Sequence, residues 1–346
     1  MAKKLESASV TKSPSGKQDE VLPPGSVIRD RWKCIGRIGS GLGSFVYEIY
    51  DTATCDNCCM KVEPGTVTQS MLRVEVSVLR RLQGKPHILK YLGCGRNPSF
   101  SYLVMALAGN SLDQLRRHAK NRKFSLSTSM RLHIHCLEAI EIVHKIGFLH
   151  RDIKPANFAT GRIDNTIYIL DFGLARQYIQ RDGNLRLPRA VAGFRGTVRY
   201  ASINAHRNRD LGRVDDIWSL FYMIIEFATG YLPWRSITDK DEVGTMKEHT
   251  PLDVLLQQVP HEFFRYYNHI QSLKFPDEPD YALLHELINR VCRRHCFHRE
   301  DPYDWEQSPR LKTTLTELTV SADVHQVKGK GTNSDSEMLD PFQEGG

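Results

Sequence analysis

The stretch HRDIKPAN, residues 150–157, is followed closely by TIYILDFG, residues 166–173. The short apolar run TIYIL predicts a buried strand between two polar groups. One loop therefore carries Asp152, Lys154 and Asn157, and the end of a strand delivers a second aspartate. Two carboxylates and an amide beside a lysine suit a divalent cation that holds a phosphate. One of the two aspartates then remains to accept the proton of a hydroxyl group.

These two stretches resemble the catalytic loop and the metal-binding loop of protein kinases, which have the patterns H-R-D-x-K-x-x-N and D-F-G. All eight diagnostic positions of the two patterns are matched. A polar turn that contains Asp, Lys and Asn by chance is the alternative, and the second motif at the right place downstream disfavours it. The resemblance implies an α+β fold of two lobes, with an antiparallel sheet in the N-lobe and mainly helices in the C-lobe.

Length and composition are typical of a soluble globular protein of about two domain-sized units. The chain has 346 residues, of which 40% are hydrophobic and 25% charged, and its net charge is +7. This modest basic excess suits acidic or phosphorylated partners, but it is too diffuse to indicate nucleic-acid binding. We find no apolar signal segment at the start and no lipidation motif. The longest apolar run, 217–228, is too short to cross a bilayer.

Four parts are expected along the chain. Residues 1–26 and 311–346 are rich in polar and small residues, which predicts disordered tails. Residues 27–108 are expected to form the N-lobe, and residues 109–310 the C-lobe.

The eight cysteines include two clusters that superficially look like metal sites. The first contains Cys55, Cys58 and Cys59, and the second runs from Cys292 to His298. Neither has the paired ligand spacing of a zinc site, so we expect free thiols. The dipeptide Asp56-Asn57 is better explained as the turn of a hairpin.

A glycine-rich turn lies between two runs of β-branched and aromatic residues, 32–38 and 45–50. This order of strand, glycine turn and strand excludes the usual dinucleotide-binding motif, whose glycines open a helix. It resembles the kinase loop that covers the phosphates of ATP, G-x-G-x-x-G-x-V, with a serine in place of the third glycine. Small residues still allow backbone amides to approach a phosphate. The residues that the resemblance assigns to the nucleotide in this loop are Ile38, Gly39, Ser40, Gly41, Leu42, Gly43, Ser44 and Val46.

Lys61 lies in the apolar strand 58–63, where a charged side chain needs a partner or a path to water. The next apolar pattern, 71–82, has helical spacing and carries Glu75 on a face away from its arginines. In the kinase pattern the corresponding lysine and glutamate form an ion pair that positions the lysine on the α- and β-phosphates.

The runs 88–95 and 101–107 predict two further strands. The second leads into a segment that resembles the kinase hinge, where exposed backbone groups can bind the edge of an adenine. The resemblance places Met105 behind the adenine, which is compatible with a role in the core, and adds Leu107 to the nucleotide-binding residues.

Two long helices are expected in the second lobe. The first spans 126–145, and its His133 and His135 are interpreted as satisfied or exposed helix residues rather than as metal ligands. The second begins at Asp216, is apolar nearly all round and ends at Gly230.

The segment 174–196 contains no serine or threonine, and Tyr178 is its only hydroxyl side chain. In many kinases a phosphate in this segment pairs with the arginine that precedes the catalytic aspartate. We therefore expect the segment to fold without phosphorylation and the enzyme to be constitutively active. This interpretation leaves the partner of Arg151 open.

Residues 202–204, Ser-Ile-Asn, stand where most kinases have A-P-E. This replacement is typical of the casein kinase 1 group. The runs 192–196 and 216–219 are most similar to the tau-tubulin kinase branch of that group, and the resemblance covers about residues 27–306.

The resemblance implies transfer of the γ-phosphoryl group of ATP to a serine or threonine hydroxyl, with ATP and Mg²⁺ as cofactors. Asp152 would orient the hydroxyl and accept its proton, and Lys154 would neutralise charge on the moving phosphoryl group. Asn157 and Asp171 would hold Mg²⁺. Lys154 also favours serine and threonine over tyrosine, and Thr197 would support the loop by a hydrogen bond near Asp152.

Protein substrates are expected, and Arg199, Arg213 and Lys240 could form an anion pocket for acidic or pre-phosphorylated sequences. A solvated basic surface is the alternative. We expect a monomer in the cytoplasm or nucleus, with no nucleic-acid or membrane partner. The other function considered is a catalytically silent pseudokinase that acts as a scaffold, and the retention of every catalytic residue disfavours it.

Overall fold

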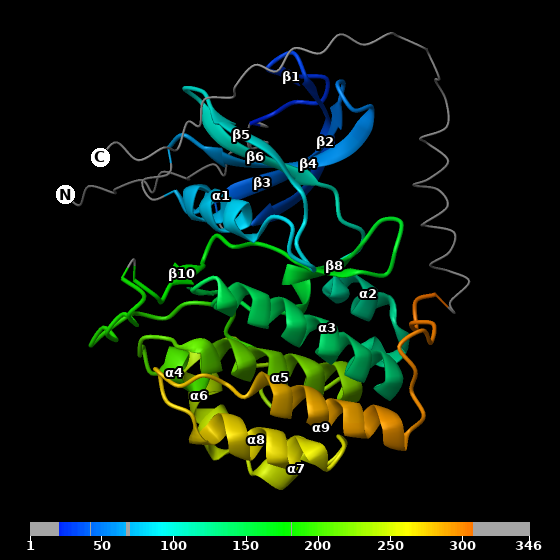
Figure 1. Cartoon of the computed structure of the whole chain (residues 1–346), viewed down its shortest axis with the longest axis vertical. Helices are drawn as coiled ribbons and strands as arrows, with labels where there is room; N and C mark the ends of the chain where they lie inside the picture. The colour runs from blue at the N-terminus through cyan, green and yellow to red at the C-terminus, as the bar shows by residue number, and fades with distance from the viewer. Residues whose placement is uncertain (1–20, 42, 67–69, 181, 307–346) are drawn as a thin grey trace, which may run out of the picture.

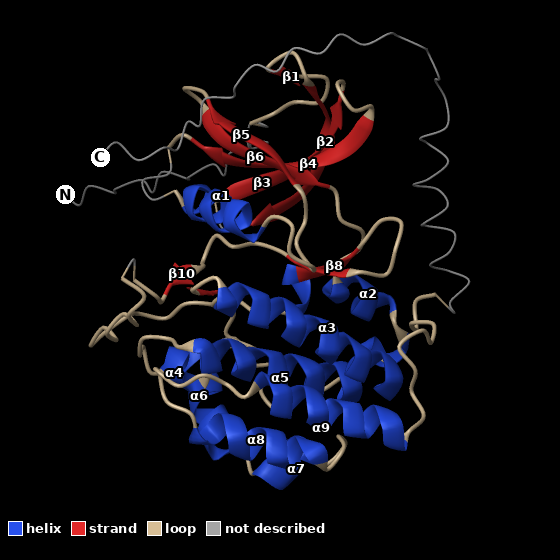
Figure 2. Ribbon diagram, in the orientation of Figure 1, coloured by secondary structure: helices blue, strands red, loops and turns tan. Residues whose placement is uncertain are grey.

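Antiparallel strands form the N-terminal lobe. The computed structural model describes residues 21–306, except 42, 67–69 and 181. In this part of the chain, six strands pair in the order β1-β2-β3-β4-β6-β5. Their bounds are β1 (Val27–Ile28), β2 (Trp32–Gly41), β3 (Ser44–Asp51), β4 (Asp56–Pro64), β5 (Tyr91–Arg96) and β6 (Phe100–Ala106). Figure 2 shows this sheet in the upper half of the molecule, with most helices in the lower half.

The sheet has a small hydrophobic core on one face, which includes Trp32, Tyr47, Ile49 and Val104. Leu22 belongs to the same core and is only 2% exposed. The predicted disordered tail, residues 1–26, is therefore wrong at Leu22, because this side chain is already packed in the core. Residues 1–20 and 307–346, which contain most of the two predicted tails, lie outside the described residues.

The turn between β3 and β4 is not where the sequence predicted it. Asp56 and Asn57 are the first residues of β4, and they pair with Asp51 and Tyr50. The turn lies just before them and includes Cys55, which has a positive φ of 59°. All eight cysteines are free thiols, as expected.

Helix α1 (Met71–Leu82) packs against the sheet and has the predicted bounds. Ser70 caps its first turn by accepting a hydrogen bond from the amide of Arg73. Its buried stripe carries Glu75 among apolar residues such as Leu72, Val76 and Leu79. The helix therefore presents one carboxylate inward, toward β4.

Helices make up most of the second lobe, which lies below the sheet in Figure 1. Short strands and turns lie between them and carry the loops that matter for function. In chain order the elements are α2 (Leu112–His118), η1 (Lys120–Arg122), α3 (Leu126–Lys145), β7 (Phe148–Leu149), η2 (Pro155–Asn157), β8 (Phe158–Thr160), β9 (Ile167–Ile169), β10 (Arg176–Gln177), α4 (Ile203–His206), α5 (Arg213–Thr229), α6 (Lys240–His249), α7 (Leu252–Leu256), α8 (Glu262–Ser272) and α9 (Tyr281–Arg294).

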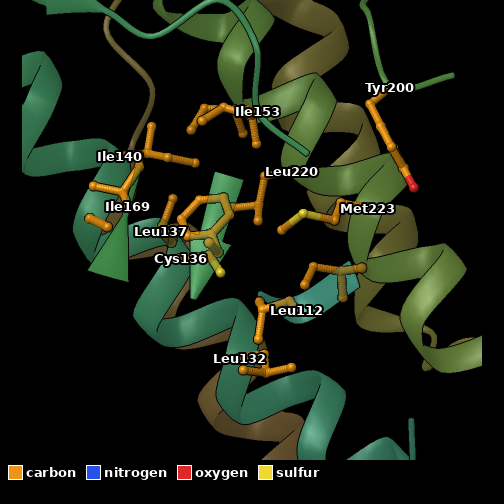
Figure 3. Packing of buried hydrophobic residues seen from close by; sticks show 14 of the residues in the cluster. Leu112, Leu132, Cys136, Leu137, Ile140, Ile153, Ile169, Tyr200, Leu220 and Met223 are labelled. Carbon is orange, nitrogen blue, oxygen red and sulfur yellow. The ribbon is translucent and has the colours of Figure 1, made fainter. Parts of the chain in front are cut away.

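Helices α3 and α5 form the centre of this lobe. Figure 3 shows Leu137 and Ile140 of α3 in the same apolar cluster as Leu220 and Met223 of α5. Helix α3 has the predicted bounds, whereas α5 begins at Arg213, three residues before the predicted start. Gly230 ends α5 in the left-handed conformation, as predicted. No helix among the described residues is long and apolar enough to cross a membrane.

Candidate active site

Five separate parts of the chain meet at one pocket between the lobes, with a volume of about 140 Å³, and the start of α1 is one of them. Gly41 and Ser44 come from the hairpin of β2 and β3, and Lys61 comes from β4. The loop after β7 supplies Asp152 and Lys154, and Asp171 follows β9. The structure thus brings Lys61, Asp152, Lys154 and Asp171 to one place, while Asn157 contacts the backbone of Asp152 but does not line the pocket.

Lys61 lies between two carboxylates that come from different elements. Its Nζ is 2.6 Å from Oε2 of Glu75 and 2.8 Å from Oδ1 of Asp171. Burial alone would lower the pKa of Lys61, but the two carboxylates outweigh burial and raise it. Burial would likewise raise the pKa of Asp171, but Lys61 and the amide of Gly173 lower it. Lys61 is therefore a fixed positive charge that faces the pocket.

Glu63 holds the start of helix α1 and was missed by the sequence analysis. It is buried at the end of β4, and its carboxylate accepts hydrogen bonds from the hydroxyl of Ser70 and the backbone amides of Met71 and Leu72. An acidic side chain here satisfies amides that a helix start leaves without partners. This contact ties α1 to the strand that carries Lys61, and so fixes the distance between Lys61 and Glu75.

Asp152 is surrounded by groups that orient its carboxylate. Lys154 donates from Nζ to Oδ2 at 2.6 Å, and Thr197 donates from its hydroxyl to Oδ1 at 2.7 Å. The side-chain amide of Asn157 donates to the backbone carbonyl of Asp152 at 2.8 Å. The predicted support from Thr197 is thus present. Both oxygens of Asp152 are held, while its position in the pocket leaves it accessible to a hydroxyl group.

Asp216 anchors the backbone of the catalytic loop from below. This buried carboxylate accepts hydrogen bonds from the amides of His150 at 2.8 Å and Arg151 at 2.7 Å, and from Nε2 of His144 at 2.8 Å. Burial would raise the pKa of Asp216, but the bond from His144 helps to lower it. Arg151 has a φ of 68°, an unfavourable value for a residue with a side chain, and the bond to its amide stabilises it.

The side chain of Arg151 binds a backbone oxygen. Its Nε donates to the carbonyl of Leu174 at 2.8 Å. Burial and the nearby Arg176 lower the pKa of Arg151 to about 10. Arg151 therefore links the catalytic loop directly to the start of the segment 174–196, which answers the question that the sequence left open.

The segment 174–196 is held to the second lobe at several points. Strand β10 pairs with β7, and the hydroxyl of Tyr178 is buried and donates to the carbonyl of His144 at 2.8 Å. Arg189 pairs with Asp210 at 2.9 Å. At the far end, Gly196 has a φ of 102°, and a Cβ there would lie 2.8 Å from the carbonyl oxygen of Arg151.

The Ser-Ile-Asn run is attached to the central helix. The hydroxyl of Ser202 donates to Oδ1 of Asp215 at 2.6 Å, and the side-chain amide of Asn204 donates to the same oxygen at 3.1 Å. Complete burial raises the pKa of Asp215 to about 6, although these donors favour its charged form. The two polar residues of the run therefore fasten this segment to α5.

The predicted nucleotide loop is a hairpin, as expected. Gly39 pairs with Val46 and Gly41 with Ser44, while Leu42 lies outside the described residues. Ile38 is half exposed, and Ser40 and Gly43 are also accessible. Behind this loop, Met105 is buried in the core and Leu107 is partly buried.

The three cations of the predicted anion pocket each have a different acidic partner. Arg199 pairs with Glu226 at 3.3 Å, Arg213 pairs with Glu278 at 3.1 Å, and Lys240 pairs with its neighbour Asp241. An anion would therefore have to compete with these carboxylates.

A strand-rich lobe over a helical lobe, with Lys61, Asp152 and Asp171 facing one pocket between them, defines the architecture of a protein kinase. The protein kinase domain family matches residues 32–301, and the chain belongs to this family.

The relatives found by sequence comparison carry names of serine/threonine-protein kinases. The chain is 40% identical over 285 residues to a Dictyostelium discoideum protein named as a probable kinase of this kind, covering 82% of the chain but only 58% of that relative. A Caenorhabditis elegans protein with a provisional name of the same kind is 37% identical over 298 residues, 83% of the chain and 85% of the relative. The C. elegans serine/threonine-protein kinase spe-6 is 32% identical over 311 residues, 87% of the chain and 82% of the relative.

Proposed function

We propose that the protein is an active serine/threonine kinase that transfers the γ-phosphoryl group of ATP to protein hydroxyls. The observation that carries this proposal is the meeting of Lys61, Asp152, Lys154 and Asp171 at one pocket. A scaffold without activity would not need to keep all four, or the contacts of Asn157 and Thr197 that orient Asp152.

The residues present fit ATP and Mg²⁺, which protein kinases use. Asn157 and Asp171 offer the amide and carboxylate oxygens that Mg²⁺ prefers, and bound Mg²⁺ would supply positive charge to the phosphates. Lys61 would bind the phosphates from above, held by Glu75. Backbone amides of the glycine hairpin would face the same phosphates.

Asp152 accepts the proton of the substrate hydroxyl in the proposed mechanism. Its Oδ1 is already oriented by the hydroxyl of Thr197, and Lys154 lies against Oδ2. A substrate hydroxyl that enters the pocket would approach this carboxylate while Lys154 compensates the charge on the moving phosphoryl group. Catalysis would then rest on position and charge, with no covalent intermediate.

Two variants test this function. Asp152→Asn removes the proton acceptor and Lys61→Met removes the phosphate ligand, so each is expected to abolish transfer from radiolabelled ATP to a protein substrate. Lys33→Met, an exposed lysine on β2, is the matched control and should keep full activity. Near-normal transfer by either active-site variant would reject the assigned roles of these residues, whereas no transfer by the parent protein would favour the pseudokinase scaffold.

Constitutive activity is part of the proposal. Tyr178, the one hydroxyl side chain of the segment 174–196, is buried against His144. Arg151, which would receive a phosphate in many kinases, binds the carbonyl of Leu174. Protein that has been treated with a phosphatase should therefore phosphorylate its substrate at an unchanged rate, and complete loss of activity would refute this.

Membership of the casein kinase 1 group, and of its tau-tubulin kinase branch, is supported by residues 202–204 and by the physical role of Ser202 and Asn204. Both donate hydrogen bonds to Asp215 and so anchor this run to α5. A comparison of Ser202→Ala with Ser272→Ala, an exposed serine at the end of α8, tests the anchor. The first variant alone should lose activity and stability.

A preference for acidic or pre-phosphorylated substrates is the finer part of the proposal. Arg199, Arg213 and Lys240 supply the positive charge, and each must exchange its present carboxylate partner for the substrate anion. Peptide arrays with and without an upstream phosphoserine measure the preference, and Lys240→Gln should reduce it while Lys33→Gln should not. Equal rates on both peptide sets would reject the pocket. We propose a monomer in the cytoplasm or nucleus, which sedimentation and imaging of a tagged chain would test.

A further inference from the structure

Two histidines and a glutamate lie close together where the loop between α1 and β5 meets helix α3. His87 lies in the loop between α1 and β5, and His135 and Glu138 lie one turn apart on α3. Each offers one ligand atom, and these three atoms all lie within 4.8 Å of one another. Among the described residues this is the one group of at least three His, Cys, Asp or Glu residues with such spacing.

When the ring of His87 is neutral, its hydrogen bonds leave Nε2 with a lone pair. Its Nδ1 lies 2.7 Å from the carbonyl oxygen of Ile167, so Nδ1 must carry a proton and donate it. Its Nε2 lies 3.2 Å from Oε2 of Glu138. A lone pair that faces a carboxylate at this distance is repulsive, unless a cation or a second proton lies between them.

His135 directs a second nitrogen at the same carboxylate. Its Nδ1 is buried and has no hydrogen-bond partner among the described residues. This atom lies 3.5 Å from Oε2 of Glu138, and the rings of His135 and His87 are 5.7 Å apart. A buried nitrogen that makes only this long contact and no hydrogen bond is poorly satisfied, and a bound cation would satisfy it.

We propose that Nε2 of His87, Nδ1 of His135 and the carboxylate of Glu138 bind one Zn²⁺ ion. Two imidazole nitrogens and one carboxylate are a known donor set for zinc with an open fourth position. The carbonyl of Ile167 supplies the outer hydrogen bond that fixes the orientation of a zinc-bound histidine.

The fourth position has room for water or another ligand. His135 and Glu138 line a surface hollow of about 320 Å³, together with His285, Cys292 and His298. The run Cys292–His298 lacks the ligand spacing of a zinc site, and from the sequence alone His135 is interpreted as an ordinary helix residue. Spacing along the chain could not show that His87 lies beside them.

Arg299 would compete with a zinc ion for the carboxylate of Glu138. Its guanidinium lies 4.0 Å from Oε2 of Glu138, and 69% of the side chain is exposed. Such a distant and exposed pair contributes little, so Zn²⁺ can displace it at small cost.

Zinc in this site would tie together three elements that reach the active site. Besides the side-chain bond to Ile167, the backbone carbonyl of His87 accepts a hydrogen bond from the amide of Ile169 at 3.0 Å. Ile167 and Ile169 both belong to β9, which leads into Asp171. The metal would thus join α3 and β9 to the loop that follows α1, and its expected role is structural.

The test measures metal content and does not depend on kinase activity. The full chain is stripped with a chelator, dialysed against Zn²⁺, washed and examined by elemental mass spectrometry. We expect one zinc per chain in the parent protein and in the control His118→Gln, an exposed helix histidine. We expect none in Glu138→Gln or His135→Gln. Circular dichroism verifies that each variant is folded, and only the parent and control should gain thermal stability from Zn²⁺.

Co²⁺ in place of Zn²⁺ identifies the ligands. A site of two histidines and a glutamate should show visible bands without the strong near-ultraviolet band of a cobalt–thiolate bond. A thiolate band would overturn the proposal in favour of the cysteines. Zinc retention that is equal in all variants, or no retention in the parent, would also overturn it. Nuclear magnetic resonance that finds both imidazoles doubly protonated at neutral pH in the presence of Zn²⁺ would do the same.

Discussion

Two regions of the active site hold their charged groups in different ways. The first is the junction of the lobes, where Lys61 lies, and the second is the floor of the site, where Asp216 lies under the catalytic loop. At the junction, Lys61 meets Glu75 and Asp171 only through side-chain pairs, and 44% of the Asp171 side chain is exposed. In the floor, Asp216 exposes only 2% of its side chain and binds the backbone of the catalytic loop. Side-chain pairs between separate elements can part while the core stays intact, whereas a buried carboxylate that holds backbone amides cannot be released without local unfolding.

This difference indicates which part of the site is adjustable. The floor sets the position of Asp152 as part of the fold, while the junction sets the position of Lys61 by contacts that can be broken and remade. Variants of the two regions should therefore affect stability and activity in different proportions.

The largest effect is expected from Asp216→Asn. An amide in this position loses the negative charge and turns one acceptor into a donor, which faces either the amide of Arg151 or both the amide of His150 and the ring of His144. We expect a loss of about 3–5 kcal/mol in the free energy of unfolding, together with loss of activity. Urea denaturation measures it, with the exposed Asp241→Asn as control. An unchanged urea midpoint in Asp216→Asn would contradict the proposed difference between the two regions.

Glu75→Gln should separate activity from stability. Lys61 loses its buried anionic partner but keeps Asp171, so we expect only about 1–2 kcal/mol of lost stability. A lysine that shifts by about 1 Å should lower phosphoryl transfer by about a hundredfold. Parallel urea and transfer measurements test this, and Glu48→Gln on β3 serves as control. Loss of stability equal to that of Asp216→Asn would show that both regions are anchored alike.

A third effect is the pH dependence of stability that arises from His206 at the end of α4. His206 donates from Nδ1 to the carbonyl of Lys240, and its Nε2 accepts a hydrogen bond from Nζ of Lys247 at 3.1 Å. Burial and the charge of Lys247 lower the pKa of His206 to about 4. Between its ordinary pKa near 6.5 and this value, the unfolded chain binds more protons than the folded chain.

The contribution of His206 to stability is therefore complete above about pH 6.5 and is lost as the pH falls toward about 4. We expect at most about 3 kcal/mol from this group. Denaturation curves from pH 7 to about pH 4 in the parent protein and in His206→Gln isolate the effect. The variant should show a weaker pH dependence, and identical slopes would contradict the assignment.

The smallest effect is expected from Tyr178→Phe. The variant loses the hydrogen bond to the carbonyl of His144 and the contact of the hydroxyl with Arg213, which should cost about 1 kcal/mol and leave activity unchanged. Thermal unfolding and a transfer assay measure both. Loss of activity without loss of stability would mean that the hydroxyl has a regulatory role, and it would contradict the constitutive state that we propose.

The sequence predicted the residues whose chemistry depends on short spacing. Asp152, Lys154 and Asp171 occur in two compact motifs, and Lys61 and Glu75 follow from a charged residue in an apolar strand and the helix after it. The helices 71–82 and 126–145 were predicted with the observed bounds because their apolar periods are long and regular. Strand bounds were less accurate, since residues 88–90 lie outside β5.

The supporting residues could not be predicted in the same way. Asp216 lies far along the chain from the amides that it binds, and no local pattern shows that they meet. Glu63 follows a strand like many exposed acidic residues, and only the fold turns it toward the start of α1. For Arg199, Arg213 and Lys240, residue type suggested free cations, but it could not reveal the acidic partner that each has in the structure.

Gly196 has a consequence for how the kinase could be switched off. With its positive φ and the carbonyl of Arg151 so close, this position admits no other amino acid without a backbone shift. A displacement of the segment 174–196 would also break the bonds that join Thr197 to Asp152 and Arg151 to Leu174. Displacement of this segment would therefore release the catalytic loop from two of the contacts that orient it.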